Sequence, residues 1–116
     1  MDKFNIISRL TYRKIEKADI SKYGVEDTED LFIRKLSVAD RSVIMDLWKA
    51  EKSAEASGFI LATALVDAGE QKIFDDPETD AKAIINDWPC DLVDGLATQI
   101  LKFSGFLKDE EQPEKN

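Results

Sequence analysis

The chain has 116 residues, of which 43% are hydrophobic and 34% are charged, and its net charge is −8. Histidine is absent, which excludes Ser-His-Asp and Cys-His catalytic groups as well as histidine metal sites. Neither G-x-x-x-x-G-K-[ST] nor G-x-G-x-x-G occurs, so no glycine motif for binding phosphate is present. No apolar run approaches the ~20 residues that span a bilayer, and the first residues lack the pattern of a secretory signal. We therefore expect one cytosolic domain, residues 1–107, that does not enter a membrane.

The first third of the chain predicts a β-hairpin. Residues 1–12 hold four apolar side chains that fit either one helix face or a short strand. Lys14–Ile20 alternates loosely and could pair with Leu31–Leu36, because the acidic stretch between them contains Gly24 and suits an exposed loop. Neither face of Leu31–Leu36 is purely apolar, so we expect this strand near a sheet edge.

A helix is predicted to begin after Ser37. Ser37 is a favourable N-cap residue, and Asp40 stands where it can complete an approximate capping box. Apolar residues then recur at helical spacing. The last of the large ones is Trp48. Because glycine favours the left-handed conformation that terminates helices, we expect this helix to end near Ser57-Gly58.

The next segment, Phe59–Val66, is ambiguous. Its eight residues contain one hydroxyl group, so they fit either a buried strand or about two turns of a buried helix. The polar turn Asp67–Glu70 and the return Lys72–Phe74 favour a hairpin over the helix.

The last third predicts two helices. Asp76-Pro77 provides an N-cap followed by proline at the first helical position, and Trp88-Pro89 begins a second helix that Gly105 ends. Residues 108–116 form a polar, acidic stretch that we expect to be a disordered tail. The fold class expected from the whole chain is α+β, mainly α-helical. Its parts are an N-terminal strand or hairpin region, a central helix, a short hairpin or buried apolar segment, and two C-terminal helices.

Charge and cysteine content add three expectations. Residues 1–23 have a net charge of +3 and residues 75–94 one of −6, which could favour head-to-tail association into a homo-oligomer. An acidic surface that merely keeps the protein soluble is the simpler interpretation. The overall negative charge argues against nucleic acid as a partner. Cys90 is the only cysteine and is expected to be a small buried residue rather than a reactive thiol.

Four stretches of the chain, in this order and spacing, resemble the tail assembly chaperone family of long-tailed bacteriophages (siphophages). They are Phe32–Arg41 (aromatic-apolar-Arg-x-Leu-Ser-x-x-x-Arg), Leu65–Phe74 (two apolar residues, Asp-x-Gly, four residues, then Phe), the acidic helix start Asp75–Asp80, and Ile100–Gly105. The resemblance covers about residues 12–107. Ala68–Gln71 departs from the more polar turn common in the family, and residues 1–11 match no pattern that we recognise.

The resemblance implies a non-enzymatic role without cofactor or metal. Such proteins cover the long helical tape measure protein and help tail tube subunits assemble around it, in the cytoplasm of the bacterial host. They commonly occur with a longer form of themselves, made by ribosomal frameshifting. Codons for Glu114-Lys115-Asn116 can spell the slippery heptamer A-AAA-AAC, so the nucleotide sequence of the gene would test for such a product.

A chaperone for a helical client needs an apolar groove with an acidic rim. The candidates for partner binding are Arg34, Trp48, Trp88, Phe103 and Phe106. Each aromatic residue alone is more often part of a core, and Phe106-Leu107, past the predicted helix end, is the pair most expected to stay exposed. Arg34 could pair with an acidic neighbour, for which an ordinary surface salt bridge is the simpler interpretation.

Two other functions compete with this one. A small acidic inhibitor, such as a nucleic-acid mimic, would use the acidic residues 75–94, although helix starts attract acidic residues for local reasons. An enzyme working with carboxylates alone could place a divalent ion at Asp75-Asp76 or at Asp91 and Asp94. No loop has the spacing of metal ligands, which weakens this second alternative.

Overall fold

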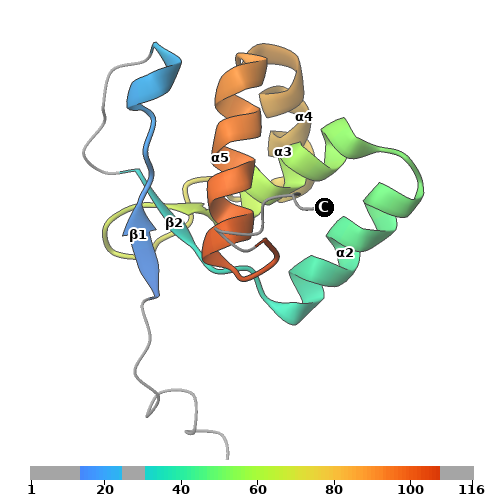
Figure 1. Ribbon diagram of the computed structural model, residues 1–116, viewed down its shortest axis with the longest axis horizontal. Helices are drawn as coiled ribbons and strands as arrows, with labels where there is room; N and C mark the ends of the chain where they lie inside the picture. Colours follow the sequence, from blue (N-terminus) through green and yellow to red (C-terminus); the bar gives the residue numbers. More distant parts are fainter. Residues whose placement is uncertain (1–13, 25–30, 108–116) are drawn as a thin grey trace, which may run out of the picture.

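The structure is a computed structural model that describes residues 14–24 and 31–107. The predictions for the first segment and for a disordered tail at 108–116 lie outside the described residues. In chain order the elements are β1 (Ile15–Lys17), the 3-10 helix η2 (Ser21–Tyr23), β2 (Phe32–Arg34), α2 (Val38–Lys49), α3 (Ser53–Ala64), β3 (Leu65–Val66), α4 (Pro77–Asp87) and α5 (Cys90–Phe103). A small sheet lies beside a larger group of helices, so the predicted α+β, mainly helical fold class is confirmed (Figure 1).

The three short strands form one antiparallel sheet in the order β1-β2-β3. The predicted hairpin is confirmed, since β1 pairs with β2 and Glu16 lies opposite Ile33. The prediction that this second strand lies near an edge is wrong, because β3 pairs with its other side and makes β2 the central strand. Its mixed pattern has another cause: Ile33 is fully buried, whereas Phe32 and Arg34 are only half-buried, as on a sheet with one covered face.

The capping box predicted at the start of α2 is present. The Asp40 N–H donates to the Ser37 side chain, and the Asp40 carboxylate accepts the Ser37 N–H at 2.9 Å. The predicted end near Ser57-Gly58 is wrong, because α2 stops at Lys49 and Glu51 adopts a φ of 61°. The Glu51 N–H donates to the Trp48 carbonyl and the Lys52 N–H to that of Leu47, which is the Schellman pattern of a helix end. Glu51 thus adopts the left-handed backbone conformation that we expected at Gly58.

Gly58 instead lies inside α3, where that helix crosses α4. A Cβ atom added at Gly58 would lie 2.8 Å from the Ala81 carbonyl oxygen and 2.9 Å from the Cγ1 atom of Ile85. Helix backbones can approach this closely only where a side chain is missing. The glycine therefore serves packing rather than termination.

The ambiguous segment is mostly helix. Phe59–Ala64 completes α3, and only Leu65–Val66 forms a strand, so the preference for a hairpin across the whole segment is wrong. Of the second strand predicted at Lys72–Phe74, only one antiparallel bridge, between Val66 and Lys72, is present. Periodicity could not separate the alternatives, because residues 60–66 are buried on every side and leave no polar face to mark the period.

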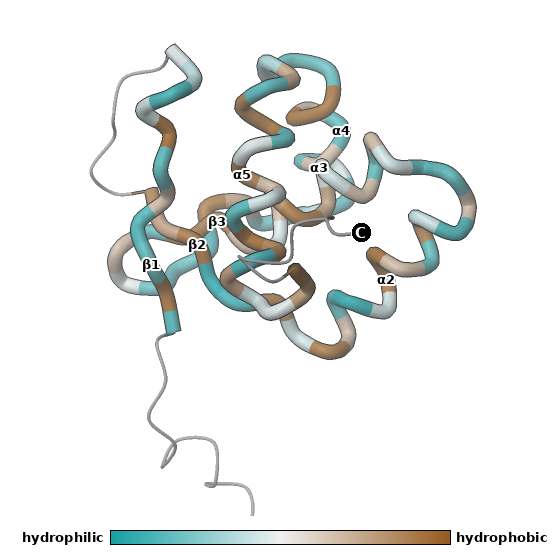
Figure 2. Tube along the Cα trace, in the orientation of Figure 1, coloured by the Kyte–Doolittle hydropathy of each residue, from teal (hydrophilic) through white to brown (hydrophobic). Residues whose placement is uncertain are grey.

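The last two helices begin as predicted, and the second of them ends as predicted. Pro77 opens α4, Pro89 precedes α5, and Gly105, with a φ of 90°, ends α5. Their apolar residues meet those of α3 and the sheet in one core, whose fully buried large side chains are Ile33, Ile44, Ile60, Leu61, Leu65, Val66, Ile84, Leu96 and Ile100. The tube coloured by hydropathy shows these hydrophobic stretches converging between the sheet and the helices (Figure 2).

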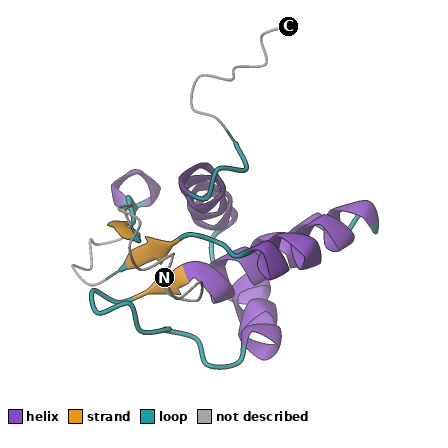
Figure 3. Cartoon of the chain, turned by 90° about the horizontal axis from the view of Figure 1, so that it is seen from below, coloured by secondary structure: helices purple, strands orange, loops and turns teal. Residues whose placement is uncertain are grey.

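Helix α2 stands apart from this core. Ile44 is its only buried residue. Seen from below, the sheet lies on one side of the molecule and α2 runs outward on the other (Figure 3). The packing partner of α2 is α3, which follows it directly in the chain. Most of the surface of this twelve-residue helix is therefore not covered by the core.

Candidate functional site: an apolar groove along helix α2

Exposed apolar side chains concentrate on α2. Within the described residues, six large hydrophobic side chains are exposed, and four of them belong to α2: Val38, Val43, Met45 and Trp48. The other two are Ile73 and Leu107. Scattered apolar residues are normal on a protein surface, but a group on one helix marks a surface that binds something.

Three of these four residues belong to one stripe. Val38, Arg41, Met45 and Trp48 follow one another at intervals of three, four and three residues, so they share one face of the helix. The core-facing Ile44 lies on a neighbouring face. The stripe is therefore apolar with a single cation in it, and it lies beside the face of α2 that packs against the core.

The opposite wall of the groove is the chain just after α5. At Gly105 the chain turns back, and the Phe106 N–H donates to the Leu101 carbonyl at 2.9 Å, in the pattern of a Schellman end. This turn brings Phe106 and Leu107 to face the stripe. We call the space between them the α2 groove; it has a volume of about 450 Å³ and is lined by Leu36, Ser37, Val38, Arg41, Met45, Trp48, Ser104, Gly105, Phe106 and Leu107.

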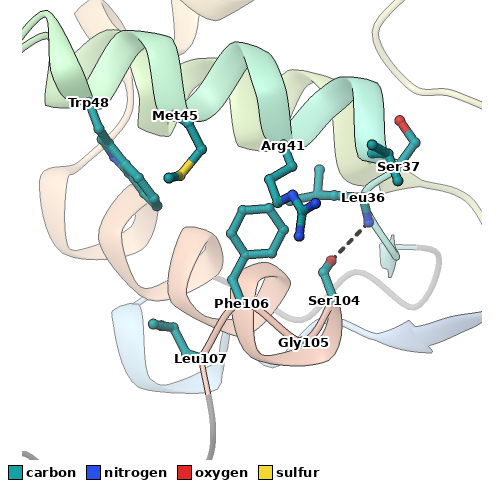
Figure 4. A pocket seen from close by; sticks show the side chains of 10 residues that line it. Leu36, Ser37, Arg41, Met45, Trp48, Ser104, Gly105, Phe106 and Leu107 are labelled. Carbon is teal, nitrogen blue, oxygen red and sulfur yellow. Dashed lines mark hydrogen bonds between the residues drawn. The ribbon is translucent and has the colours of Figure 1, made fainter.

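Two hydrogen bonds join the walls of the α2 groove at its closed end. The Leu36 N–H donates to the Ser104 Oγ at 2.9 Å, and the Lys35 Nζ donates to the Phe103 carbonyl at 3.0 Å. Toward the other end the groove is open, with Met45, Trp48 and Leu107 projecting into it (Figure 4). The segment before α2 thus fixes the position of the turn after α5, although 68 residues separate them in the chain.

No family model matches the sequence, and no curated protein or solved structure matches the chain. What this groove can do is therefore inferred from its own residues and from the resemblance that the sequence carries. Most of the side chains that line the groove are apolar, and four of the lining residues come from exposed positions of one helix, as on surfaces that bind a helix of another protein.

The two arginines of the Phe32–Arg41 stretch have different environments. The Arg34 guanidinium donates to the Lys35 carbonyl at 2.6 Å and to the Asp40 carboxylate at 3.4 Å, so it is satisfied locally. The Arg41 side chain lies in the α2 groove and makes no hydrogen bond or ion pair with any residue of the described ranges. Only Arg41 is therefore available to a partner in this groove.

The structure brings together two of the five predicted partner-binding residues. Trp48 and Phe106 line the α2 groove from opposite walls. Phe103 is half-buried behind it, with the Lys35 Nζ 4.7 Å from the centre of its ring. Trp88 packs against the core and against Phe74, with 6.1 Å between ring centroids. Leu107 is exposed as expected, but Phe106 is half-buried.

The sequence reasoning did not name Val38, Arg41 or Met45 as partner-binding residues, and it named Leu107 only as an exposed residue beside Phe106, although all four line the groove. A usable signal existed for three of them, since positions 38, 41, 45 and 48 repeat at intervals of three and four, as in helices that pair with other helices. That signal is separate from the spacing of Ile44 and Leu47 toward the core. Leu107 was expected to be exposed because it follows the predicted helix end, but its place in the groove depends on the turn at Gly105.

A second hollow lies on the other side of α2, between α2, α3 and α4. It has a volume of about 420 Å³, and its apolar walls include Val43, Leu47, Phe59 and Ile85. Glu55, Glu78 and Lys82 stand around it. Helix α2 thus contributes apolar side chains to two separate hollows, one on each side of it.

Three of the seven acidic residues between 75 and 94 form local hydrogen bonds at helix starts. The Asp76 carboxylate accepts the Thr79 hydroxyl at 3.0 Å, that of Asp80 accepts the Asp76 N–H at 3.2 Å, and that of Asp91 accepts the Leu92 N–H at 2.8 Å. In residues 14–24 and 31–107, no three acidic or cysteine side chains are grouped so that they could hold a metal ion. None of the helices in those same ranges is long and apolar enough to cross a membrane.

Two other titratable groups differ from ordinary expectation. Cys90, expected to be buried, is exposed, because it is the first residue of α5 and lies where the chain enters that helix. The pKa of Asp19 is lowered, chiefly because the Ser21 hydroxyl and the Ser21 N–H both donate to its carboxylate. Asp19 lies outside the α2 groove, as does Cys90.

Proposed function

We propose that this protein is a non-enzymatic chaperone of phage tail assembly and that it holds the tape measure protein in the α2 groove. The observation that carries the proposal is the uncovered apolar stripe of α2, faced by Phe106 and Leu107 across an open groove. The resemblance of the sequence to siphophage tail assembly chaperones supplies the identity of the client.

The physical logic is that of a temporary cover. A long helical client exposes apolar stripes until the tail tube closes around it, and such stripes associate with one another in water. A small protein that lays an apolar groove on each stripe prevents this association. Its net charge of −8 then keeps the complex dispersed, because like-charged complexes repel each other.

The other partners follow from the same proposal. The chaperone would act in the cytoplasm of the bacterial host, before the mature virion forms, together with the tail tube protein and a longer frameshifted form of itself. Self-association into a homo-oligomer would place several α2 grooves along one extended client. Repeated weak contacts on one long chain raise the overall affinity without any new kind of contact.

Co-expression tests the proposal. The tape measure protein encoded in the same gene cluster is produced with the wild-type chain, with Met45→Glu, and with Ile73→Glu as the matched control. Met45 and Ile73 are equally exposed, each at 43%, but only Met45 lines the α2 groove. We expect the tape measure protein to be soluble with the wild-type chain and with Ile73→Glu, and to precipitate with Met45→Glu.

Two results would contradict the proposal. A tape measure protein that is equally insoluble with and without the wild-type chain removes the chaperone function. Equal solubility with Met45→Glu and Ile73→Glu removes the α2 groove as the site, provided that both variants melt at the wild-type temperature.

A further inference from the structure

We infer that the α2 groove binds an α-helix of the client whose apolar stripe carries one acidic residue, and that this residue pairs with Arg41. The inference rests on the proposed function and deepens it, because it states which segments of a long client the chaperone would select.

The shape of the groove favours a helix over an extended peptide. Val38, Arg41, Met45 and Trp48 are spaced by three, four and three residues, which is the spacing with which one helix receives the side chains of another. An extended peptide that binds by adding a strand would need an unpaired strand edge, and none of the lining residues belongs to β1, β2 or β3. The stripe extends over eleven residues of α2, from Val38 to Trp48, which is about 15 Å and matches roughly three turns of a partner helix.

Charge selects among such helices. The Arg41 guanidinium lies among apolar side chains and has no carboxylate partner within the described residues, whereas Arg34 is already paired with Asp40. A purely apolar helix laid on the stripe would remove water from Arg41 and leave its charge uncompensated, which is costly. A glutamate or aspartate in the stripe of the partner removes that cost by accepting hydrogen bonds from the guanidinium. A lysine there would add repulsion.

Synthetic peptides provide the test. Each peptide has about 18 residues, because shorter helices are marginal in water, and carries leucines at intervals of three and four. One central position of that stripe is glutamate, alanine or lysine. The chain contains two tryptophans, so a Trp88→Phe variant leaves Trp48, in the groove, as the only tryptophan reporter of binding.

In this Trp88→Phe background we expect the glutamate peptide to bind about fivefold more tightly than the lysine peptide, with the alanine peptide between them. Adding Arg41→Glu should reverse the order. Lys72→Glu makes the same change in net charge on an exposed residue outside the groove, so it should leave the order unchanged. Arg41 and Lys72 are both exposed, so neither substitution should disturb the fold. The melting temperature of each variant is measured to check this.

Several outcomes would overturn the inference while leaving the chaperone function itself intact. Equal affinity for the three peptides would mean that Arg41 swings out of the groove instead of pairing. No binding of any peptide, together with successful co-expression, would place the client elsewhere.

Two further results would identify another occupant of the groove. A dimer in sedimentation that Met45→Glu abolishes would make a second copy of the chain the occupant of the groove. Binding only after removal of residues 108–116 would make the acidic tail of the chain itself the occupant. Failure of co-expression itself is a separate result that contradicts the proposed function.

Discussion

Helix α2 and the group formed by α3, α4 and α5 use the same kind of residue differently. In α5, Leu96 and Ile100 are fully buried, and α3 is buried along most of its length. In α2, only Ile44 is buried, while Met45 and Trp48 remain exposed beside it. Apolar residues at helical spacing therefore indicate that a helix has an apolar face, but they do not indicate what covers it. In this molecule the uncovered part of that face is the candidate site.

The most direct way to break this comparison is to truncate one apolar residue in each region. Leu96→Ala removes a fully buried side chain and should lower the free energy of unfolding by about 2–5 kcal/mol. Met45→Ala removes an exposed one and should change it by less than about 0.5 kcal/mol. Urea denaturation of both variants measures the difference. Similar losses would show that α2 is part of the core after all.

Two glycine-to-alanine variants test how closely the backbones of α3 and α4 approach one another. Gly58→Ala places a Cβ atom 2.8 Å from the Ala81 carbonyl oxygen, a backbone atom that cannot rotate away. We expect a loss of about 1–3 kcal/mol in the free energy of unfolding, even though alanine favours helices. Gly69→Ala is the control, because its Cβ would lie 3.5 Å from the Asp67 Oδ1, an ordinary contact. If Gly58→Ala is stabilising, α3 and α4 are less closely packed than described.

Loss of the α2 cap should have a smaller and more local effect. Ser37→Ala removes the hydroxyl that accepts the Asp40 N–H, a loss of about 1 kcal/mol in helix stability. Because α2 lies largely outside the core, hydrogen exchange should accelerate in α2 and remain unchanged in α5. Equal acceleration in both helices would show that they unfold as one unit.

The smallest expected effect concerns Asp19, which lies in neither of the two compared regions. Its lowered pKa means that folding is favoured by the charged carboxylate above the usual value of 3.8, and that this contribution is lost as the pH falls through the folded-state pKa. Ser21→Ala removes one of the two donors and should raise the pKa of Asp19 toward its usual value. Titration followed by NMR measures the shift, and an unchanged pKa would mean that the backbone N–H alone maintains it.

Local signals in the sequence predicted much of the fold. The capping box at Ser37 and the prolines that precede α4 and α5 act within a few residues, so they could be recognised without knowledge of tertiary contacts. The errors arose where distant contacts decide. Gly58 resembled a helix terminator, but a glycine is needed there because the Ala81 carbonyl lies close to it where α3 contacts α4. The central position of β2 depends on its pairing with Leu65 of β3.

The candidate site was predicted only in part for the same reason. Trp48 and Phe106 stood out as large aromatic residues, and the structure places both in the α2 groove. Trp88 stood out equally but packs against the core, because residue type alone cannot distinguish a covered ring from an open one. Arg41 was visible only as the last residue of a motif, and its isolation from any carboxylate is a property of the folded chain.

The junction between α3 and β3 constrains the length of the chain. The Leu65 N–H donates to the Leu61 carbonyl and closes the helix, while the same residue pairs with Ile33 in the sheet. One residue inserted before Leu65 would shift the register of β3 against β2 and turn each side chain of β3 to the opposite face of the sheet, since neighbouring strand residues face opposite ways. The turn at residues 67–71 belongs to no helix or strand, so its length is not constrained in this way. Insertions and deletions in related chains should therefore accumulate in that turn and be absent from the junction.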